Sequence, residues 1–251
     1  MGKIVAVANQ KGGVGKTTTA VNLTACLKLK GKKVLLCDFD PQGNASSGLG
    51  VSPKAGETSY DMIISGAEAG GYIVNTKYGD VIPSDTRLAA AEQEISDMED
   101  RALRLRKSLK SVKDKYDFIF IDCPPSLGLL NIGGIAAGDT VLIPMQCEYY
   151  ALEGLSQIVS TIRTIKNGIN PAVEIEGILL TMYDARTNLT IQVSEEIKRH
   201  FGKKVYKTVI PRNVRISEAP SHGLPVVAYD RLSRGAEAYG DLATEFLKNN
   251  K

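Results

Sequence analysis

One stretch of the chain decides the fold: Ala8-Asn9-Gln10-Lys11-Gly12-Gly13-Val14-Gly15-Lys16-Thr17-Thr18. The apolar run 4–8 predicts a buried strand, and the amphipathic run after the glycines, to residue 29, predicts a helix. Glycines in such a turn let the backbone approach phosphate oxygens, while the N–H groups and the helix N-terminus favour anions. The stretch therefore predicts a phosphate-binding loop.

The loop departs from the ordinary phosphate-loop pattern in one place. That pattern requires a glycine five residues before its last glycine, where this chain has Gln10. A second lysine, Lys11, stands at the entrance instead. Lys16 is expected to reach the β- and γ-phosphates, and the Thr17 hydroxyl to bind Mg²⁺. The expected nucleotide contacts of the loop are Lys11, Gly12, Gly13, Val14, Gly15, Lys16, Thr17 and Thr18.

The sequence Lys-Gly-Gly-x-Gly-Lys-Thr resembles the deviant Walker A motif of the ParA/MinD ATPases. The resemblance implies ATP and Mg²⁺ as cofactors, with Lys11 and Lys16 as catalytic residues. It also implies that Lys11 reaches the nucleotide of a partner subunit in a sandwich homodimer. The alternative is a glycine-rich turn whose lysines are merely solvated.

Length and composition limit the class of protein. The 251 residues fit one α/β domain, 1–251, and no apolar run approaches the roughly 20 residues of a membrane span. The chain enters its first strand without a signal-peptide pattern, so we expect a cytoplasmic protein that is not bound to a membrane. Four cysteines lack C-x-x-C spacing, which predicts buried, reduced thiols and disfavours iron–sulfur members of the superfamily.

Apolar runs and amphipathic runs alternate along the rest of the chain. We expect further buried strands at 34–38, 116–122, 140–144, 176–181 and 205–210, and a short strand pair at 72–74 and 80–83. Helices are expected at 59–65, 86–95, 101–113, 188–201 and 234–247, with a loop at 45–58. A further helix is expected to open within 146–154 and to run to about residue 166. This alternation predicts a doubly wound α/β fold, a mostly parallel sheet with helices on both faces.

Three aspartates follow predicted strands. Asp38 ends the run 34–38 and Asp40 follows it shortly after, while Asp122 ends the run 116–122, all at the edge of a doubly wound sheet where ligands bind. Asp122 is expected to orient Mg²⁺ through water, together with Thr17 and Asp40. By the resemblance, Asp40 positions the attacking water and Asp38 anchors the loop. The alternatives are a turn-forming aspartate at Asp40 and a simple strand end at Asp122.

The resemblance also assigns a base-binding segment and a dimer face. In the family, the segment after the last strand holds adenine, which implies contacts from Pro211, Asn213 and Met182. Residues 144–154 resemble ParA/Soj sequences in particular, and that region lies near the dimer face in the family. A plain strand–helix connection is the alternative for 144–154.

The segment 198–215 carries seven basic residues and no acid: Lys198, Arg199, Lys203, Lys204, Lys207, Arg212 and Arg215. A patch of one sign predicts a polyanion as partner, unless it is only a solvated face. The chain has no Trp and no aromatic pattern interleaves the cations, so phosphate contacts to duplex DNA fit better than base readout.

Residues 184–188 and 213–223 match segments of chromosomal ParA/Soj ATPases. The resemblance implies that Arg186 and Arg215 contact nonspecific DNA, with Lys198, Arg199, Lys203 and Lys204 as further candidates. It implies a nucleoid-associated ATPase of chromosome or plasmid partitioning. Hydrolysis is expected to be slow and stimulated by a centromere-binding ParB-type protein. Because the chain starts at its first strand, no operator-binding domain is expected.

Three other functions were weighed against this one. A MinD-like membrane-associated regulator of cell division needs an amphipathic membrane helix, whereas the tail 241–251 is short and contains acids. A cobyrinate amidase is expected to need an added amidotransferase region, for which no room remains. A DNA-binding module without enzymatic activity leaves Lys16, Thr17, Asp40 and Asp122 without a purpose.

Overall fold

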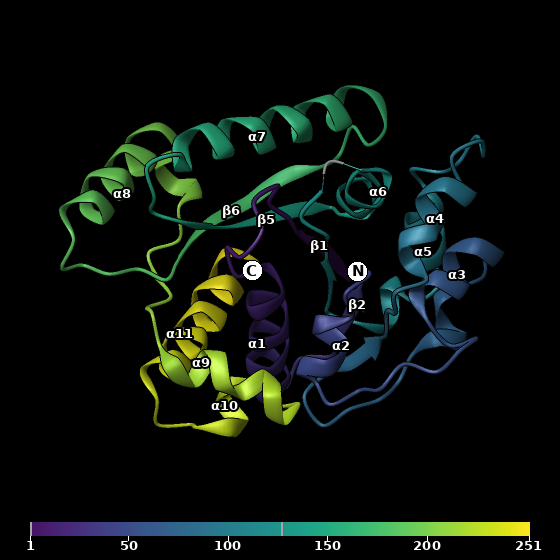
Figure 1. The fold of residues 1–251 in the computed structure, drawn as a ribbon, viewed down its shortest axis with the longest axis horizontal. Helices are drawn as coiled ribbons and strands as arrows, with labels where there is room; N and C mark the ends of the chain where they lie inside the picture. The colour runs from purple at the N-terminus through teal and green to yellow at the C-terminus, as the bar shows by residue number, and fades with distance from the viewer. Residues whose placement is uncertain (1, 127) are drawn as a thin grey trace.

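Six parallel strands form one sheet at the centre of the molecule (Figure 1). The computed structural model describes residues 2–126 and 128–251. The sheet has the order β3-β2-β4-β1-β5-β6, and every pairing of named strands is parallel. The strands are β1 (Lys3–Val7), β2 (Val34–Asp38), β3 (Asp80–Ile82), β4 (Phe118–Asp122), β5 (Thr140–Gln146) and β6 (Glu174–Thr181). The doubly wound α/β fold is therefore confirmed.

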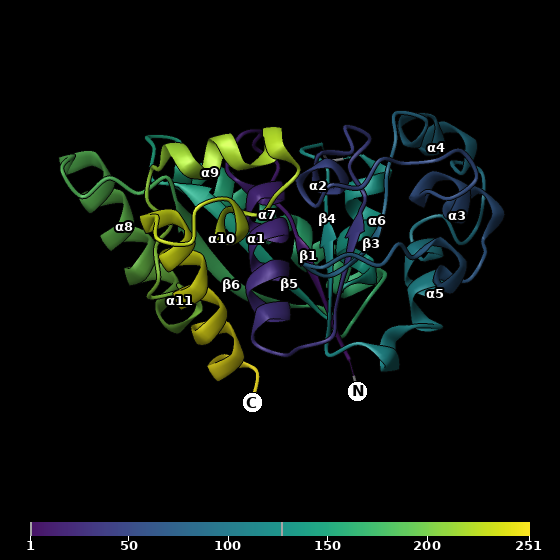
Figure 2. The same cartoon turned by 90° about the horizontal axis from the view of Figure 1, so that it is seen from below.

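Helices cover both faces of the sheet (Figures 1 and 2). One face carries α1 (Lys16–Leu29), α2 (Asn44–Gly48), α9 (Val214–Glu218), α10 (Val226–Tyr229) and α11 (Arg234–Asn249). The other face carries α6 (Leu129–Ala137), α7 (Ala151–Gly168) and α8 (Asn188–Phe201), continued by α3 (Ser59–Ser65), α4 (Leu88–Glu94) and α5 (Arg104–Lys110).

The two-residue period of a strand divides β1 between these two layers. Ile4, Ala6 and Ala8 pack in the core under α6 and α7, whereas Val5 and Val7 pack in the core under α1 and α11. The sheet is thus buried on both sides, which explains why its strands read as continuous apolar runs. The carboxyl ends of β1, β2 and β4 meet at one edge, and the phosphate loop follows β1 there.

The expected strand at 205–210 is only partly formed. It lies beside β6 in the parallel sense, but only single bridges join Ile178 to Val205 and Tyr183 to Pro211. Between them, the Lys207 and Thr208 N–H groups donate to the Glu245 carboxylate on α11 at 2.8 and 2.9 Å. Because a side chain takes these two donors, they are lost to a strand ladder.

Other expected elements differ in extent. The expected strand at 72–74 is reduced to one antiparallel bridge, Val74 to Val81. The expected loop 45–58 contains most of α2, and the helix expected at 101–113 is limited to α5. Helices α6, α9 and α10 were not expected, because each is short and the first is rich in glycine.

The apolar face of the last helix is already used inside the protein. Tyr239, Leu242 and Phe246 of α11 are buried in the core beneath α1. The apolar side of this helix therefore faces the core and not solvent. A MinD-like membrane helix would need an apolar side that is exposed. A membrane-spanning helix is absent from the part of the chain that the structure describes. All four cysteines are free and buried, as expected.

Candidate nucleotide-binding site

The phosphate loop is held open by contacts from β5 and β6. Gly13 and Gly15 have positive φ angles of 74° and 88°, a region that favours glycine because L side chains clash there. Asn9 Nδ2 donates to the Pro144 carbonyl at 2.8 Å, and Thr181 Oγ1 donates to the Val14 carbonyl at 2.7 Å. Contacts from the neighbouring strands therefore fix the turn near both of its ends.

Lys16, the first residue of α1, lies in this turn with its side chain buried. Its Nζ donates to the Lys11 carbonyl at 3.1 Å. Burial lowers the pKa of Lys16, and the nearby carboxylates of Asp122 and Asp40 partly oppose that shift. A buried ammonium whose only recorded bond is to a carbonyl is well placed to bind an anion.

Lys11 lies at the loop entrance, and its side chain is half exposed. Its N–H donates to Asn9 Oδ1 at 3.0 Å, and its ammonium forms an ion pair with Glu148 of the same chain. Glu148 follows β5, and nearby Gln146 Nε2 donates to the Gly13 carbonyl at 3.0 Å. The connection from β5 to α7 therefore contacts the loop at two places that sequence analysis did not identify.

Asp38 anchors the segment after β2, as expected. Its Oδ2 accepts from the N–H and the hydroxyl of Ser46, at 2.7 and 2.6 Å, and its Oδ1 accepts from the Asp40 N–H at 3.3 Å. Burial raises the pKa of Asp38 to about 6, although the Ser46 bonds oppose that shift. Asp38 is thus committed to the protein and is not free to bind a metal ion.

Asp122 is the residue whose surroundings call for a cation. It pairs in register with Asp38 across β4 and β2 and is fully buried. Neither of its carboxylate oxygens has a partner of good hydrogen-bond geometry within residues 2–126 and 128–251, although the Thr17 hydroxyl is near enough to lower the pKa of Asp122. Burial holds the pKa of Asp122 well above its usual range, and the negative charge of Asp38 raises it further. An orphaned carboxylate beside Thr17 fits a divalent cation, which prefers oxygen ligands.

Asp40 is buried and lies close enough to Asp122 for its charge to raise the pKa of that carboxyl. Its Oδ1 accepts the Gln42 N–H at 3.0 Å, so it also makes the turn that was the alternative interpretation. The described residues contain no cluster of three or more His, Cys, Asp or Glu side chains that could hold a metal ion. A metal ion here therefore needs ligands from phosphate and water, as is usual for Mg²⁺.

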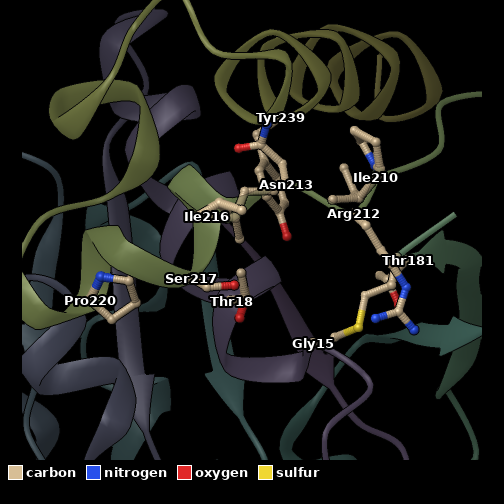
Figure 3. A pocket seen from close by; sticks show the side chains of 13 residues that line it. Gly15, Thr18, Thr181, Ile210, Arg212, Asn213, Ile216, Ser217, Pro220 and Tyr239 are labelled. Carbon is tan, nitrogen blue, oxygen red and sulfur yellow. The ribbon is translucent and has the colours of Figure 1, made fainter. Parts of the chain in front are cut away.

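A cavity of about 560 Å³ opens beside the phosphate loop (Figure 3). Met182, Pro211 and Asn213, the expected base contacts, all line it. The side-chain oxygen of Asn213, Oδ1, is buried and has no hydrogen-bond partner in the described chain. The further lining residues are Gly15, Thr18, Thr181, Ile210, Arg212, Val214, Ile216, Ser217, Pro220 and Tyr239.

Sequence analysis missed most of that lining for a structural reason. Tyr239 reaches the cavity from the middle of α11, and Ile216 reaches it from α9, two helices far from the phosphate loop in sequence. Met182 has a φ of 48°, the one positive value at a non-glycine residue among those described. Such a conformation is strained and is found at ligand sites more often than elsewhere.

The basic residues expected to bind DNA fall into two groups. Arg186 and Arg215 lie near the edge of the sheet that holds the phosphate loop, and Arg212 lines the cavity itself. Lys198, Arg199, Lys203 and Lys204 lie at the far end of α8, whose 14 residues span about 21 Å. Lys204 Nζ donates to the Ile175 carbonyl at the amino end of β6. The run 198–215 is therefore not one continuous patch.

Acids close to these cations in sequence, and Asp230 from farther along the chain, accompany them, although none occurs in the run itself. Arg186 pairs with Asp184 through two bonds of 2.8 and 2.7 Å, and its side chain is 89% exposed. Arg199 pairs with Glu196 at 2.6 Å. Arg215 pairs with Glu218 at 2.8 Å and with Asp230 at 3.3 Å. These acids hold each guanidinium in place at the surface.

Comparison with known proteins identifies the family. A family model described as "AAA domain" matches residues 2–175. Sporulation initiation inhibitor protein Soj of Bacillus subtilis (strain 168) is 58% identical, over 99% of this chain and 100% of its own. Chromosome-partitioning ATPase Soj of Treponema pallidum (strain Nichols) is 51% identical, over 98% of each chain. The chain belongs to the ParA/Soj family of chromosome-partitioning ATPases.

Solved structures of similar proteins contain a bound nucleotide and magnesium. Cobyrinic acid a,c-diamide synthase from Mycobacterium smegmatis with bound ADP and magnesium has a TM-score of 0.85 and 34% identity, covering 99% of this chain and 95% of that one. The same protein is known with an ATP analogue and magnesium. ATP and Mg²⁺ are thus the cofactors of this ATPase, as expected.

One argument from chain length is wrong. The synthase chain is covered almost completely by this one, so the length of the present chain does not exclude a protein of that name. Sequence identity distinguishes the partitioning ATPases from the synthase as relatives of this chain. The partitioning relatives are 58% and 51% identical over nearly the whole chain, whereas the synthase is 34% identical. The ParA/Soj assignment rests on that difference.

Proposed function

We propose that this ATPase closes into a sandwich homodimer on ATP, and that the dimer binds duplex DNA without sequence specificity. The observation that carries the proposal is the position of Arg212. Arg212 lines the nucleotide cavity. Hydrogen bonds from Arg186 are the main cause of the lowered pKa of Asp184, and the charge of Arg212 adds to it, so Arg212 also lies near Arg186. The nucleotide cavity and the arginine group of Arg186 and Arg212 are therefore contiguous, so nucleotide binding and DNA binding share one edge.

The residues of the loop have separate tasks in this proposal. Lys16 exchanges the Lys11 carbonyl for phosphate oxygens, and Lys11 offers its ammonium to the triphosphate of the partner subunit. Asp40 keeps Oδ1 on the Gln42 N–H and orients the attacking water with Oδ2. Thr17 and Asp122 would hold Mg²⁺, which when bound neutralises charge on the phosphate oxygens. Asp38 keeps the Asp40 segment in register with these groups.

Adenine specificity follows from Asn213 in the cavity (Figure 3). The side-chain oxygen of Asn213, Oδ1, is buried against Gly235 of α11 without a recorded partner, so the Asn213 side chain has to turn toward the cavity before this oxygen accepts a bond from an amino group on the base. The exocyclic amino group of adenine is a donor, whereas the corresponding group of guanine is a carbonyl. Asn213 therefore favours ATP over GTP.

The DNA surface in this proposal consists of Arg186, Arg212 and Arg215. Asp184 and Glu218 hold the guanidinium groups of Arg186 and Arg215 at the surface, and a phosphate oxygen can replace each acid with a similar charge-assisted bond. Dimerisation brings two copies of the group together, which multiplies phosphate contacts and hence affinity. Lys198, Arg199, Lys203 and Lys204 remain candidates for contacts at the other end of α8.

The cellular role includes a second protein. We propose that a ParB-type centromere-binding protein stimulates hydrolysis and so releases the dimer from nucleoid DNA. The names of the relatives support a role in partitioning. Intrinsic turnover is expected to be slow, because the side-chain cations that bond at the phosphate loop in the described residues are Lys11 and Lys16, and Arg212 in the adjoining cavity is assigned to DNA in this proposal.

Charge reversal tests the DNA surface. Arg215→Glu removes two phosphate contacts per dimer, so the slope of log affinity against log salt should fall by about 2, while ATP binding is kept. Lys110→Glu, an exposed lysine on α5 without a recorded ion pair, is the matched control and should leave the slope unchanged. Equal slopes for wild type and Arg215→Glu in duplex titrations at several salt concentrations would place the DNA surface elsewhere.

A further inference from the structure

The ammonium that the proposed dimer needs is already occupied in the single subunit. Lys11 Nζ forms an ion pair with Glu148, which lies in the connection between β5 and α7. The Lys11 backbone is also fixed, since its N–H donates to Asn9 Oδ1 and its carbonyl accepts from Lys16 Nζ. No other acid forms an ion pair with Lys11 in the described residues. Before Lys11 can serve a partner subunit, the contact with Glu148 must be broken.

The same connection also contacts the rest of the nucleotide site. Gln146 Nε2 donates to the Gly13 carbonyl at 3.0 Å and lies against the Met182 sulfur. Tyr149 and Tyr150, directly after Glu148, are 77% and 71% exposed and stack edge to face with their ring centres 5.0 Å apart. A segment that contacts the phosphate loop on one side and exposes two aromatic rings on the other is suited to meet a second copy of the chain.

We propose that Glu148 is a positioning residue for Lys11, which it holds against its own subunit until the triphosphate of a second copy replaces the carboxylate. The inference rests on the proposed ATP-dependent dimer. Phosphate bound at Lys16 withdraws that ammonium from the Lys11 carbonyl, which frees the Lys11 backbone at the moment when its side chain is required. Glu148 thereby opposes dimerisation of subunits that lack a triphosphate.

The size of the effect follows from the exposure of the pair. The Lys11 and Glu148 side chains are 53% and 45% exposed, so the pair belongs to the class of weak surface ion pairs. Two such pairs are broken for each dimer formed. Removing both should lower the protein concentration at half dimerisation by about two- to thirty-fold, with the larger effect at low salt.

The experiment compares Glu148→Gln with Glu153→Gln. Glu153 lines the same groove as Lys11 and Tyr150 and is exposed, and no ion pair is recorded for it, so both variants remove one negative charge from one place. Sedimentation velocity with a non-hydrolysable ATP analogue and Mg²⁺ gives the concentration at half dimerisation at 50 and 500 mM salt. Expected is tighter dimerisation for Glu148→Gln alone, with the advantage shrinking at 500 mM salt.

Other results separate the failures. If wild type dimerises with the analogue and Glu148→Gln matches Glu153→Gln or dimerises more weakly, Glu148 does not restrain Lys11, and the proposed function stands. If wild type shows no analogue-dependent dimer, both proposals fall. A gain that is independent of salt also contradicts the inference, because an ion pair must be screened. Urea unfolding of each monomer shows whether the variants keep the fold, and Glu148→Asp, which retains the charge, should stay close to wild type.

Discussion

Asp122→Asn should make the ligand-free protein more stable while abolishing its response to ATP and Mg²⁺. The carboxylate is fully buried, faces Asp38 across the sheet, and has no hydrogen-bond partner in the part of the chain that the structure describes. Leaving a buried polar group unsatisfied costs about 1–3 kcal/mol, and more when the group is charged. Because burial holds the pKa of Asp122 well above its usual range, the folded protein at neutral pH must either bury the charge or take up a proton, and the neutral, nearly isosteric amide removes that cost.

The expected gain in the free energy of unfolding is about 1–3 kcal/mol without ligand, or roughly 2–12 °C in Tm for a chain of this size. With ATP and Mg²⁺ at about 100 times their dissociation constant, wild type should gain about 2.7 kcal/mol by mass action. The variant should gain far less, because it has lost a residue that would hold the metal ion. The lead of the variant should therefore shrink with ATP and Mg²⁺, and it should reverse if that lead is below about 2.7 kcal/mol without ligand.

Urea unfolding at pH 7.5, once in EDTA and once with ATP and Mg²⁺, measures both effects. The slope with urea should stay the same, which shows that the amount of surface exposed on unfolding has not changed. Asp114→Asn is the charge-matched control, since Asp114 is exposed at the amino edge of the sheet and should change stability by less than about 0.5 kcal/mol. An Asp122→Asn protein that is less stable than wild type in EDTA would show that the carboxylate is satisfied within the protein.

Three further predictions concern other parts of the site and fold. Burial alone would raise the pKa of Glu176, but hydrogen bonds to its carboxylate, above all the one from Lys3, lower that pKa. The ionised Glu176 therefore stabilises the fold above about pH 4.5, and this contribution is lost as the pH falls. Glu176→Gln should cost about 1–3 kcal/mol at pH 7 and much less at pH 3 in urea unfolding; an equal cost at both would contradict this. Gly15→Ala should weaken ATP binding at least tenfold by calorimetry, because φ is 88° there; retained affinity would show that the loop tolerates a side chain. Asn213→Ala should reduce the preference for ATP over GTP in competition binding, and an unchanged preference would remove Asn213 from base recognition.

The sequence predicted the nucleotide edge well because its parts are local. The glycines, Lys16 and Thr17 lie within one turn between a strand and a helix, and Asp38 and Asp122 each end an apolar run. Parallel pairing then brings those run ends together without further information. Lys11 and Asp40 were found by resemblance, and their expected roles remain predictions.

What the sequence could not predict depends on contacts between distant segments. The strand expected at 205–210 is interrupted because Glu245, nearly 40 residues later, takes two of its N–H groups. The cations of 198–215 are separated by the length of α8, and Arg215 also pairs with Asp230, which lies beyond α9 and α10 in the chain. Glu148 opposite Lys11 is likewise visible only once β5 lies beside β1. Local pattern gives elements and their ends, whereas these contacts depend on how the elements pack.

The most direct test of the account is the affinity for a nonspecific DNA duplex measured with ATP, with ADP and without nucleotide, each at 50 and 200 mM salt. Tight DNA binding is predicted only when ATP and Mg²⁺ are present, and the affinity should fall steeply as the salt concentration rises. Binding should be at least tenfold weaker with ADP and without nucleotide. Equal affinity with ATP and ADP, carried by a protein that sediments as a single subunit in both, would contradict it.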